Sequence, residues 1–101
     1  MMKYKYHIIP PAREEFRLAR EWYKQQQIPG LSNRFAQSVK DCIILILQNP
    51  FVYAVRYKNI RIAHTYKFPY SIHFYLENDN IIITAIIFQG RNPLIAQGRI
   101  G

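Results

Sequence analysis

The chain opens with alternating apolar and polar residues and then changes to a longer repeat. Between Tyr4 and Ile8 every second residue is apolar, which is the period of a half-buried strand. Pro10-Pro11 ends that strand, and Pro11 or Ala12 suits the first turn of a helix, where a missing backbone N–H costs nothing. The pattern therefore predicts a strand followed directly by a helix.

The first helical repeat has a broad apolar stripe. Its positions are Ala12, Phe16, Ala19 and Tyr23, with Leu18 and Trp22 widening the stripe. Glu14 and Glu15 lie near the predicted N-terminus, where the helix dipole favours carboxylates. Residues 25–30 contain a Pro-Gly pair and end the helix.

A second helix is predicted from about Leu31 to Gln48, and Asn49-Pro50 terminates it. Its buried face comprises Leu31, Phe35, Val39, Cys42 or Ile43, and Ile46. Because its second half is apolar nearly all round, we expect other elements to cover it on more than one side. The short connection between the helices predicts an antiparallel hairpin.

After residue 53 the apolar period changes to two. One strand alternates Ile60, Ile62 and His64 with Arg61, Ala63 and Thr65, and Lys67-Phe68-Pro69 breaks it. The next alternates Tyr70, Ile72, Phe74 and Leu76 with Ser71, His73 and Tyr75. The Asn-Asp-Asn turn at 78–80 tolerates positive φ and predicts a β-hairpin. Residues 81–88 are apolar on both faces, which indicates a central strand.

The order β-α-α-β-β-β predicts an α+β fold, with a mainly antiparallel four-stranded sheet and a two-helix hairpin packed on one face. We expect residues 1–101 to form one domain. We assign to the helix side Ile60, Ile62, Tyr70, Ile72 and Phe74. The other side then becomes an open face with Arg61, Ala63, Thr65, Ser71, His73 and Tyr75, joined from the first strand by Lys5 and His7.

Basic residues dominate the charge: 14 Lys and Arg against 6 Asp and Glu give a formal net charge of +8. In so short a chain this favours a polyanionic partner such as nucleic acid, a ribosome or an acidic protein. The alternative is that the cations only keep the domain soluble. The acid-free segment 50–76 holds Arg56, Lys58, Arg61 and Lys67, and residues 90–101 add Arg91 and Arg99.

The remaining composition argues against several classes of protein. Cys42 is the only cysteine and lies in an apolar run, so we expect a buried structural thiol and a cytoplasmic protein. The apolar stretches are far too short for a bilayer span, and no signal-peptide pattern is visible, so we expect no membrane partner. The three scattered histidines have no metal-ligand spacing, and no phosphate-binding glycine loop occurs, so we expect no metal and no cofactor.

Several short motifs occur in a recognisable order along nearly the whole chain. They are Trp22-Tyr23, Arg34-Phe35, Asn49-Pro50 followed by Tyr53, Ile60-Arg61, Phe68-Pro69-Tyr70, Ser71-Ile72-His73-Phe74-Tyr75, Ala85-Ile86-Ile87 and Gly90-Arg91-Asn92-Pro93. Together they resemble the RelE/ParE superfamily, the toxins of type II toxin–antitoxin modules (plasmid stabilisation proteins), and the last is similar to the family's terminal Arg-x-Pro element. The resemblance implies the fold above and a growth inhibitor neutralised by a cognate acidic antitoxin.

Three positions depart from the RNA-cleaving branch of that family. Ser71 stands where those members commonly carry an Arg, Gln89 replaces a frequent His, and no Tyr follows Arg91. The departures favour the ParE-like branch, whose members act by binding DNA gyrase. The alternatives are a RelE-like mRNA interferase, a metal-independent endoribonuclease that cuts messenger RNA on the ribosome, and a decayed toxin that retains only antitoxin binding.

Three residues would carry the chemistry of a nuclease. Arg61 and Arg91 would clamp the phosphate, and His73 would act as general base or acid at neutral pH. The alternatives are that His73 is an ordinary solvated strand histidine, that His64 is a satisfied and partly buried one, and that Tyr75 packs against the C-terminal segment. For target binding we expect the exposed basic and aromatic set Arg56, Lys58, Arg61, Lys67, Tyr75 and Arg91.

Overall fold

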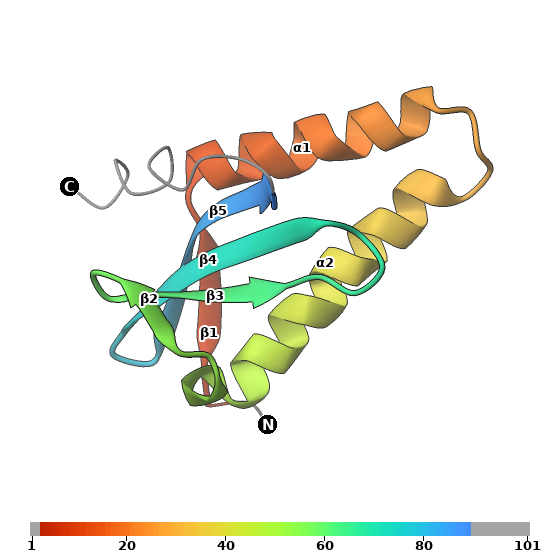
Figure 1. The fold of residues 1–101 in the computed structure, drawn as a ribbon. Helices are drawn as coiled ribbons and strands as arrows, with labels where there is room; N and C mark the ends of the chain where they lie inside the picture. Colours follow the sequence, from red (N-terminus) through yellow and green to blue (C-terminus); the bar gives the residue numbers. More distant parts are fainter. Residues whose placement is uncertain (1–2, 90–101) are drawn as a thin grey trace.

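The computed structural model describes residues 3–89, which form two helices and a five-stranded sheet (Figure 1). The elements in chain order are β1 (Lys5–Ile8), α1 (Pro10–Gln25), α2 (Leu31–Gln48), the 3₁₀ turn η1 (Pro50–Val52), β2 (Val55–Tyr57), β3 (Ile60–His64), β4 (Tyr70–Glu77) and β5 (Asn80–Phe88). The α+β class is confirmed. The short strand β2 is an addition to the four predicted strands, because three residues carry too little periodicity to be recognised in a sequence.

The strand order is β1-β5-β4-β3-β2, with β1 parallel to β5 and every other pair antiparallel. β5 lies between β1 and β4, as its apolar character on both faces predicted. β1 pairs only with the first half of β5, from Asn80 to Ile83. Beyond Ile83, α1 provides a hydrogen-bond acceptor for β5: the Ile86 amide donates to the Glu15 carboxylate over 3.1 Å.

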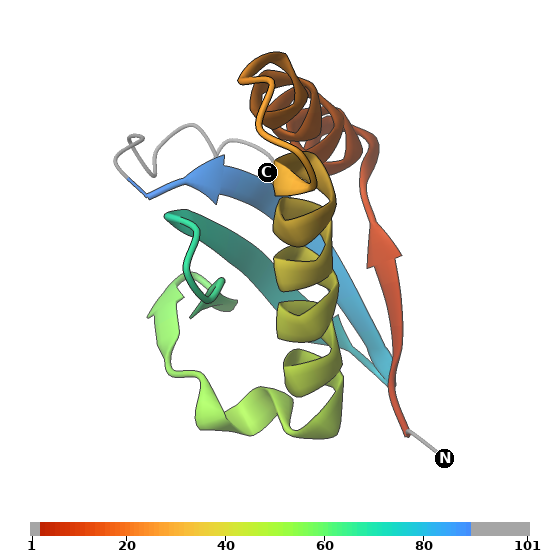
Figure 2. The same ribbon diagram turned by 90° about the vertical axis from the view of Figure 1, so that its right-hand side faces the viewer.

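The helices pack on one side of the sheet as an antiparallel hairpin. Figure 2 shows α2 lying along the inside of the curved sheet, with α1 crossing one end. α2 has the predicted bounds. It follows Gly30, whose φ of 77° lies in the left-handed region, where a residue with a side chain would be strained. Neither helix among residues 3–89 is long and apolar enough to cross a membrane.

Aromatic rings tie the helix hairpin to the loop between β3 and β4. The Phe35 ring lies 4.9 Å from that of Tyr70 and 5.5 Å from that of Phe68, and Tyr23 lies 4.8 Å from Phe35. Four residues from three separate sequence motifs therefore meet in one cluster. Their burial fixes the β3–β4 loop against the start of α2.

The helices expose more apolar surface than their patterns predicted. On α1, Leu18 and Trp22 were expected to widen the buried stripe, but they are 53% and 56% exposed. On α2, Ile44 and Leu45 are 43% and 56% exposed, so the expectation of cover on more than one side fails for these two positions. Within residues 3–89 the sheet covers one side of α2 and leaves an apolar flank uncovered.

Candidate functional site

The β3–β4 register decides which side chains share a face of the sheet. Ala63 lies opposite Ile72 and Arg61 opposite Phe74, and Ile72 and Phe74 belong to the core beneath the helices. Arg61 and Ala63 therefore point to the helix side, and the prediction that placed them on the open face is wrong by one residue. We call the other side the far face; it carries Ile60, Ile62, His64, Ser71, His73, Tyr75, Ile82, Ala85 and Ile87.

The alternation on β3 was ambiguous because the far face is also largely buried. Its Ser71, Ala85 and Ile87 are each no more than 5% exposed. The side chains of Ile60 and Ile62 therefore lie in an apolar environment on the side of the sheet away from the helices. Ala63 is small, which lets α2 approach β3 closely from the other side.

His73 is a buried residue of the far face and not a solvated one. Its imidazole is 3% exposed, and Nδ1 lies 2.7 Å from the hydroxyl oxygen of Tyr57, with which it shares a hydrogen bond. Tyr57 reaches it because β2 folds back on β3 and places Tyr57 opposite Ile60, on the same face. The interaction could not be predicted from sequence, because β2 itself was not recognised.

His64 is an exposed histidine of the far face. Its Nδ1 lies 3.1 Å from Ser71 Oγ and 3.1 Å from the amide nitrogen of Gln89. An amide nitrogen can only donate, so in this arrangement Nδ1 of His64 accepts from Gln89. The prediction that His64 is hydrogen-bonded is confirmed. The prediction that it is partly buried on the helix side is wrong, because it is exposed on the far face. Ser71 and Gln89, two of the three departures from the RNA-cleaving branch, thus meet at one imidazole.

Arg61 is held on the helix side by the segment around η1. Its guanidinium donates to the carbonyl oxygen of Tyr53 and lies 5.2 Å from the centre of the Phe51 ring. The structure therefore does not bring Arg61 together with His73. Arg91 lies outside the described residues, as does the C-terminal segment against which Tyr75 was expected to pack.

The predicted basic patch is divided between the two ends of β3. Arg56 and Lys58 are exposed around the β2–β3 turn, whereas Lys67 is exposed in the β3–β4 loop (Figure 1). Lys58 and Lys67 both have positive φ, 47° and 68°. Tyr75 is half-buried on the far face of β4. Lys67 therefore lies apart from Arg56 and Lys58, and the basic residues do not form one continuous site.

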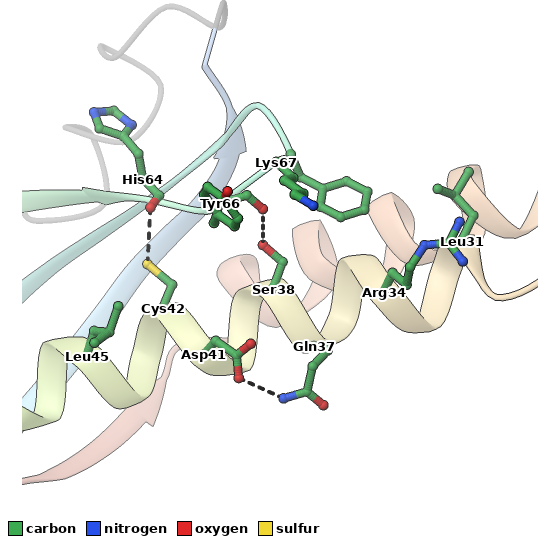
Figure 3. Close-up of a pocket in the computed structure, with 11 residues that line it drawn as sticks. Leu31, Arg34, Gln37, Ser38, Asp41, Cys42, Leu45, His64, Tyr66 and Lys67 are labelled. Atoms are coloured by element: carbon green, nitrogen blue, oxygen red, sulfur yellow. Dashed lines mark hydrogen bonds between the residues drawn. The ribbon is translucent and has the colours of Figure 1, made fainter.

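A groove of about 540 Å³ lies between α2 and the β3–β4 loop (Figure 3). Its residues are Leu31, Arg34, Gln37, Ser38, Asp41, Cys42 and Leu45 from α2, and His64, Tyr66, Lys67 and Phe68 from the other wall. The α2 positions recur every three or four residues and so form one straight stripe. This groove was not predicted from the sequence, although the apolar residues that α2 has beyond its buried face were a signal for it.

Hydrogen bonds from α2 fasten the two walls of the groove together. Ser38 Oγ donates to the carbonyl oxygen of Tyr66 over 2.8 Å, and Cys42 Sγ donates to that of His64 over 3.6 Å (Figure 3). Burial raises the pKa of the Cys42 thiol to about 11, so the thiol stays protonated at neutral pH. The prediction of a buried structural cysteine is confirmed.

The charges of the groove are predominantly positive. Arg34 and Lys67 lie toward the N-terminal end of α2, whose first turn contains no acidic residue. The one acidic side chain of the lining, Asp41, accepts a hydrogen bond from the Gln37 amide over 2.8 Å. Among residues 3–89, no three His, Cys, Asp or Glu side chains come together as a metal site.

Comparison with known proteins supports the fold through structure and not through sequence. No protein-family model matches the chain, and no curated protein matches it. Its structure is similar to a chain in a chromosomal ParDE TA system from P. aeruginosa, with a TM-score of 0.73 and 16% sequence identity. The match covers 85% of this chain and 96% of that chain. The predicted RelE/ParE-like fold is therefore confirmed.

Proposed function

We propose that this protein is the toxin of a type II toxin–antitoxin module, a cytoplasmic growth inhibitor held inactive by a small acidic antitoxin. The ParE-like fold, the net charge of +8 and the uncovered apolar flank of α2 support this proposal. A basic protein with exposed apolar surface suits a partner segment that is acidic and folds on contact.

We further propose that the toxin acts by binding its target, DNA gyrase, and not by cutting RNA. The observation that carries this proposal is the state of His73, which is 3% exposed and hydrogen-bonded to Tyr57. A general acid or base must reach the proton that it transfers. Arg61, the predicted phosphate clamp, lies on the opposite side of the sheet.

The target surface that we propose centres on the β2–β3 turn, where Arg56 and Lys58 are exposed. Tyr75 on the far face and Arg91, which follows β5 in sequence, complete the set that we assign to the target. Arg91→Ala is expected to relieve the growth arrest that expression of the wild-type chain causes in a bacterial host. Full arrest by a folded Arg91→Ala protein would remove Arg91 from the surface.

Two assays on the purified chain test the mechanism in parallel. One measures DNA supercoiling by gyrase and the other measures cleavage of ribosome-bound messenger RNA. We expect inhibition of supercoiling without RNA cleavage. Adding a stoichiometric amount of the co-expressed acidic partner is expected to restore supercoiling, because the partner holds the toxin away from its target.

The alternative function is a ribosome-dependent endoribonuclease, and one observation favours it. His64 and His73 lie on the same face of neighbouring strands, and His64 is exposed, so the far face holds two imidazoles that could serve as acid and base. His73→Asn keeps an acceptor near the position of Nδ1 but cannot transfer a proton at neutral pH. Cleavage by the wild type that His73→Asn abolishes would establish the nuclease and overturn the gyrase proposal.

A further inference from the structure

One side of α1 carries a row of four cations. Arg13, Arg17, Arg20 and Lys24 follow one another at spacings of four, three and four residues, which places them on one face of the helix. We call these four residues the α1 basic row. Arg20 is partly buried and the other three are exposed, on a helix that lies at the outside of the molecule (Figure 1). At about 1.5 Å per residue, the row is about 16 Å long.

Two adjoining clefts lie beside the row, where α1 faces the start of α2. Their volumes are about 330 Å³ and 270 Å³, and Arg20, Lys24 and Ser32 line both. The Arg20 guanidinium donates to Asn33 Oδ1 over 3.1 Å, and Ser32 Oγ donates to the Arg20 carbonyl oxygen over 3.1 Å. These contacts fix the direction of the guanidinium, so that a ligand does not have to order it on binding.

The acidic residues of α1 do not cancel the row. Glu15 lies on another side of the helix, where its carboxylate accepts a hydrogen bond from the Ile86 amide. Glu14 binds Arg17 through two hydrogen bonds, and Glu21 lines the larger cleft. Four cations less these two neighbouring carboxylates leave a net charge of +2 on this flank. The smaller cleft has no acidic side chain among the described residues that line it.

We propose that the α1 basic row binds the phosphate backbone of duplex DNA. This inference goes beyond the proposed function, because it concerns a contact on α1 that needs neither gyrase nor an antitoxin. A duplex carries one phosphate per about 3.4 Å along each strand, so a row of about 16 Å lies beside roughly five phosphates. Arg20 suits bidentate binding of one phosphate, and Lys24 adds a point charge for the next.

The distribution of side chains around α1 favours a duplex over a single strand. Proteins that bind single-stranded nucleic acid combine cations with aromatic rings on which the bases stack. The exposed ring of α1, Trp22, lies instead on the flank beside β5, where it lines a cleft together with Leu18 and Phe88. A duplex stacks its bases inside and presents its phosphates outward, so it requires only the cations.

Matched double variants test the proposal at constant net charge. Arg20→Gln/Lys24→Gln removes two cations of the row, and Arg34→Gln/Lys40→Gln removes two exposed cations of α2 outside both clefts. Lys24→Gln alone retains the Arg20–Asn33 hydrogen bond. The probes are a labelled DNA duplex of about 20 base pairs and a single-stranded RNA of about 20 nucleotides. Fluorescence anisotropy measures Kd for the full chain between about 50 and 200 mM salt, and circular dichroism verifies folding.

We expect the wild type to bind the duplex with a slope of log K against log salt of about −3 to −4, which corresponds to four phosphate contacts. Arg20→Gln/Lys24→Gln should make that slope shallower by about 1.8 and weaken binding at least about tenfold at about 50 mM salt. Lys24→Gln alone should change the slope by about half as much. The α2 pair should keep the wild-type slope, with Kd within about threefold.

Three results would contradict the proposal: no binding of the duplex by the wild type, an unchanged slope in folded Arg20→Gln/Lys24→Gln, or an equal loss of slope in both double variants. The last would show that net charge binds DNA without a defined surface. Tighter binding of the single-stranded RNA at the same salt concentration would overturn the assignment to duplex DNA. These measurements contain no gyrase, ribosome or antitoxin, so their outcome is independent of the proposed function.

Discussion

Both faces of the sheet contain buried side chains, but the two faces are stabilised by different interactions. The helix face is apolar: Phe74, Ile83 and Ile86 lie beneath α1 and α2 with at most 1% of their surface exposed. On the far face His73 is equally well buried, but its imidazole is hydrogen-bonded to Tyr57. The helix face is therefore stabilised by close packing of apolar side chains, and the far face is also stabilised by hydrogen bonds of its buried polar groups.

A histidine on an alternating strand can be buried by an element that the sequence pattern does not reveal. In the sequence, His73 occupied a position typical of a solvated or catalytic residue, because its neighbours on β4 point to the core. In the structure, β2 brings Tyr57 over it. A buried and hydrogen-bonded imidazole stabilises a fold as readily as it serves chemistry.

The largest effect should come from charging the helix face. Ile86→Asp puts a carboxylate at a position that is 1% exposed. An unpaired buried charge costs several kcal/mol against a total stability of about 5–15 kcal/mol, so we expect the protein to unfold or nearly so. Circular dichroism during urea titration measures the loss, and Ile86→Val should cost only about 0.5–1.5 kcal/mol. A stable Ile86→Asp protein would contradict the assignment of this face as the main core.

Two neighbours on β5 compare the faces directly. Ile86 packs with the large helix-side core, and Ile87, 3% exposed, packs with Ala85 in a small cluster on the far face. We expect Ile86→Ala to lower the free energy of unfolding by about 3–4 kcal/mol and Ile87→Ala by about 2 kcal/mol, because a small cluster relaxes around the cavity more easily. Equal losses in the free energy of unfolding, measured by chemical denaturation, would mean that the two faces act as one core.

Removing the Tyr57 hydroxyl tests how much hydrogen bonding stabilises the far face. Tyr57→Phe deletes the hydrogen bond to Nδ1 of His73 and leaves a buried imidazole without that partner. We expect a loss of about 1–2 kcal/mol in the free energy of unfolding. Tyr66→Phe is the control, because Tyr66 is 79% exposed and its loss should be too small to measure. If both variants unfold at the same denaturant concentration, the Tyr57–His73 bond adds nothing to stability.

The smallest effect concerns the reactivity of Cys42 and leaves stability unchanged. Burial raises its thiol pKa from 9.0 to about 11, so the reactive thiolate is scarce at pH 8 and becomes abundant only as the pH rises toward 11. We expect alkylation at pH 8 to be at least about tenfold slower in the native protein than in urea. Mass spectrometry follows the modification, and rapid native labelling would show that the wall of the groove opens.

The sequence alone determined the helices and most of the sheet. The bounds of α2, the strand periods and the Asn-Asp-Asn turn follow from local preferences, which act between residues near one another in the chain. The apolar character of residues 81–88 was enough to place β5 inside the sheet. The order of these elements was also sufficient to indicate the RelE/ParE-like fold that the structural comparison confirms.

Which groups share a site depends on how distant segments of the chain pack together. The face of β3, the pairing of Tyr57 with His73 and the separation of Lys58 from Lys67 depend on strand register and on contacts between distant segments. The groove arises in the same way, because α2 fastens the β3–β4 loop through Ser38 and leaves Leu45 exposed. Periodicity reports that a residue belongs to a buried or an exposed face, but packing decides which face that is and what lies across from it.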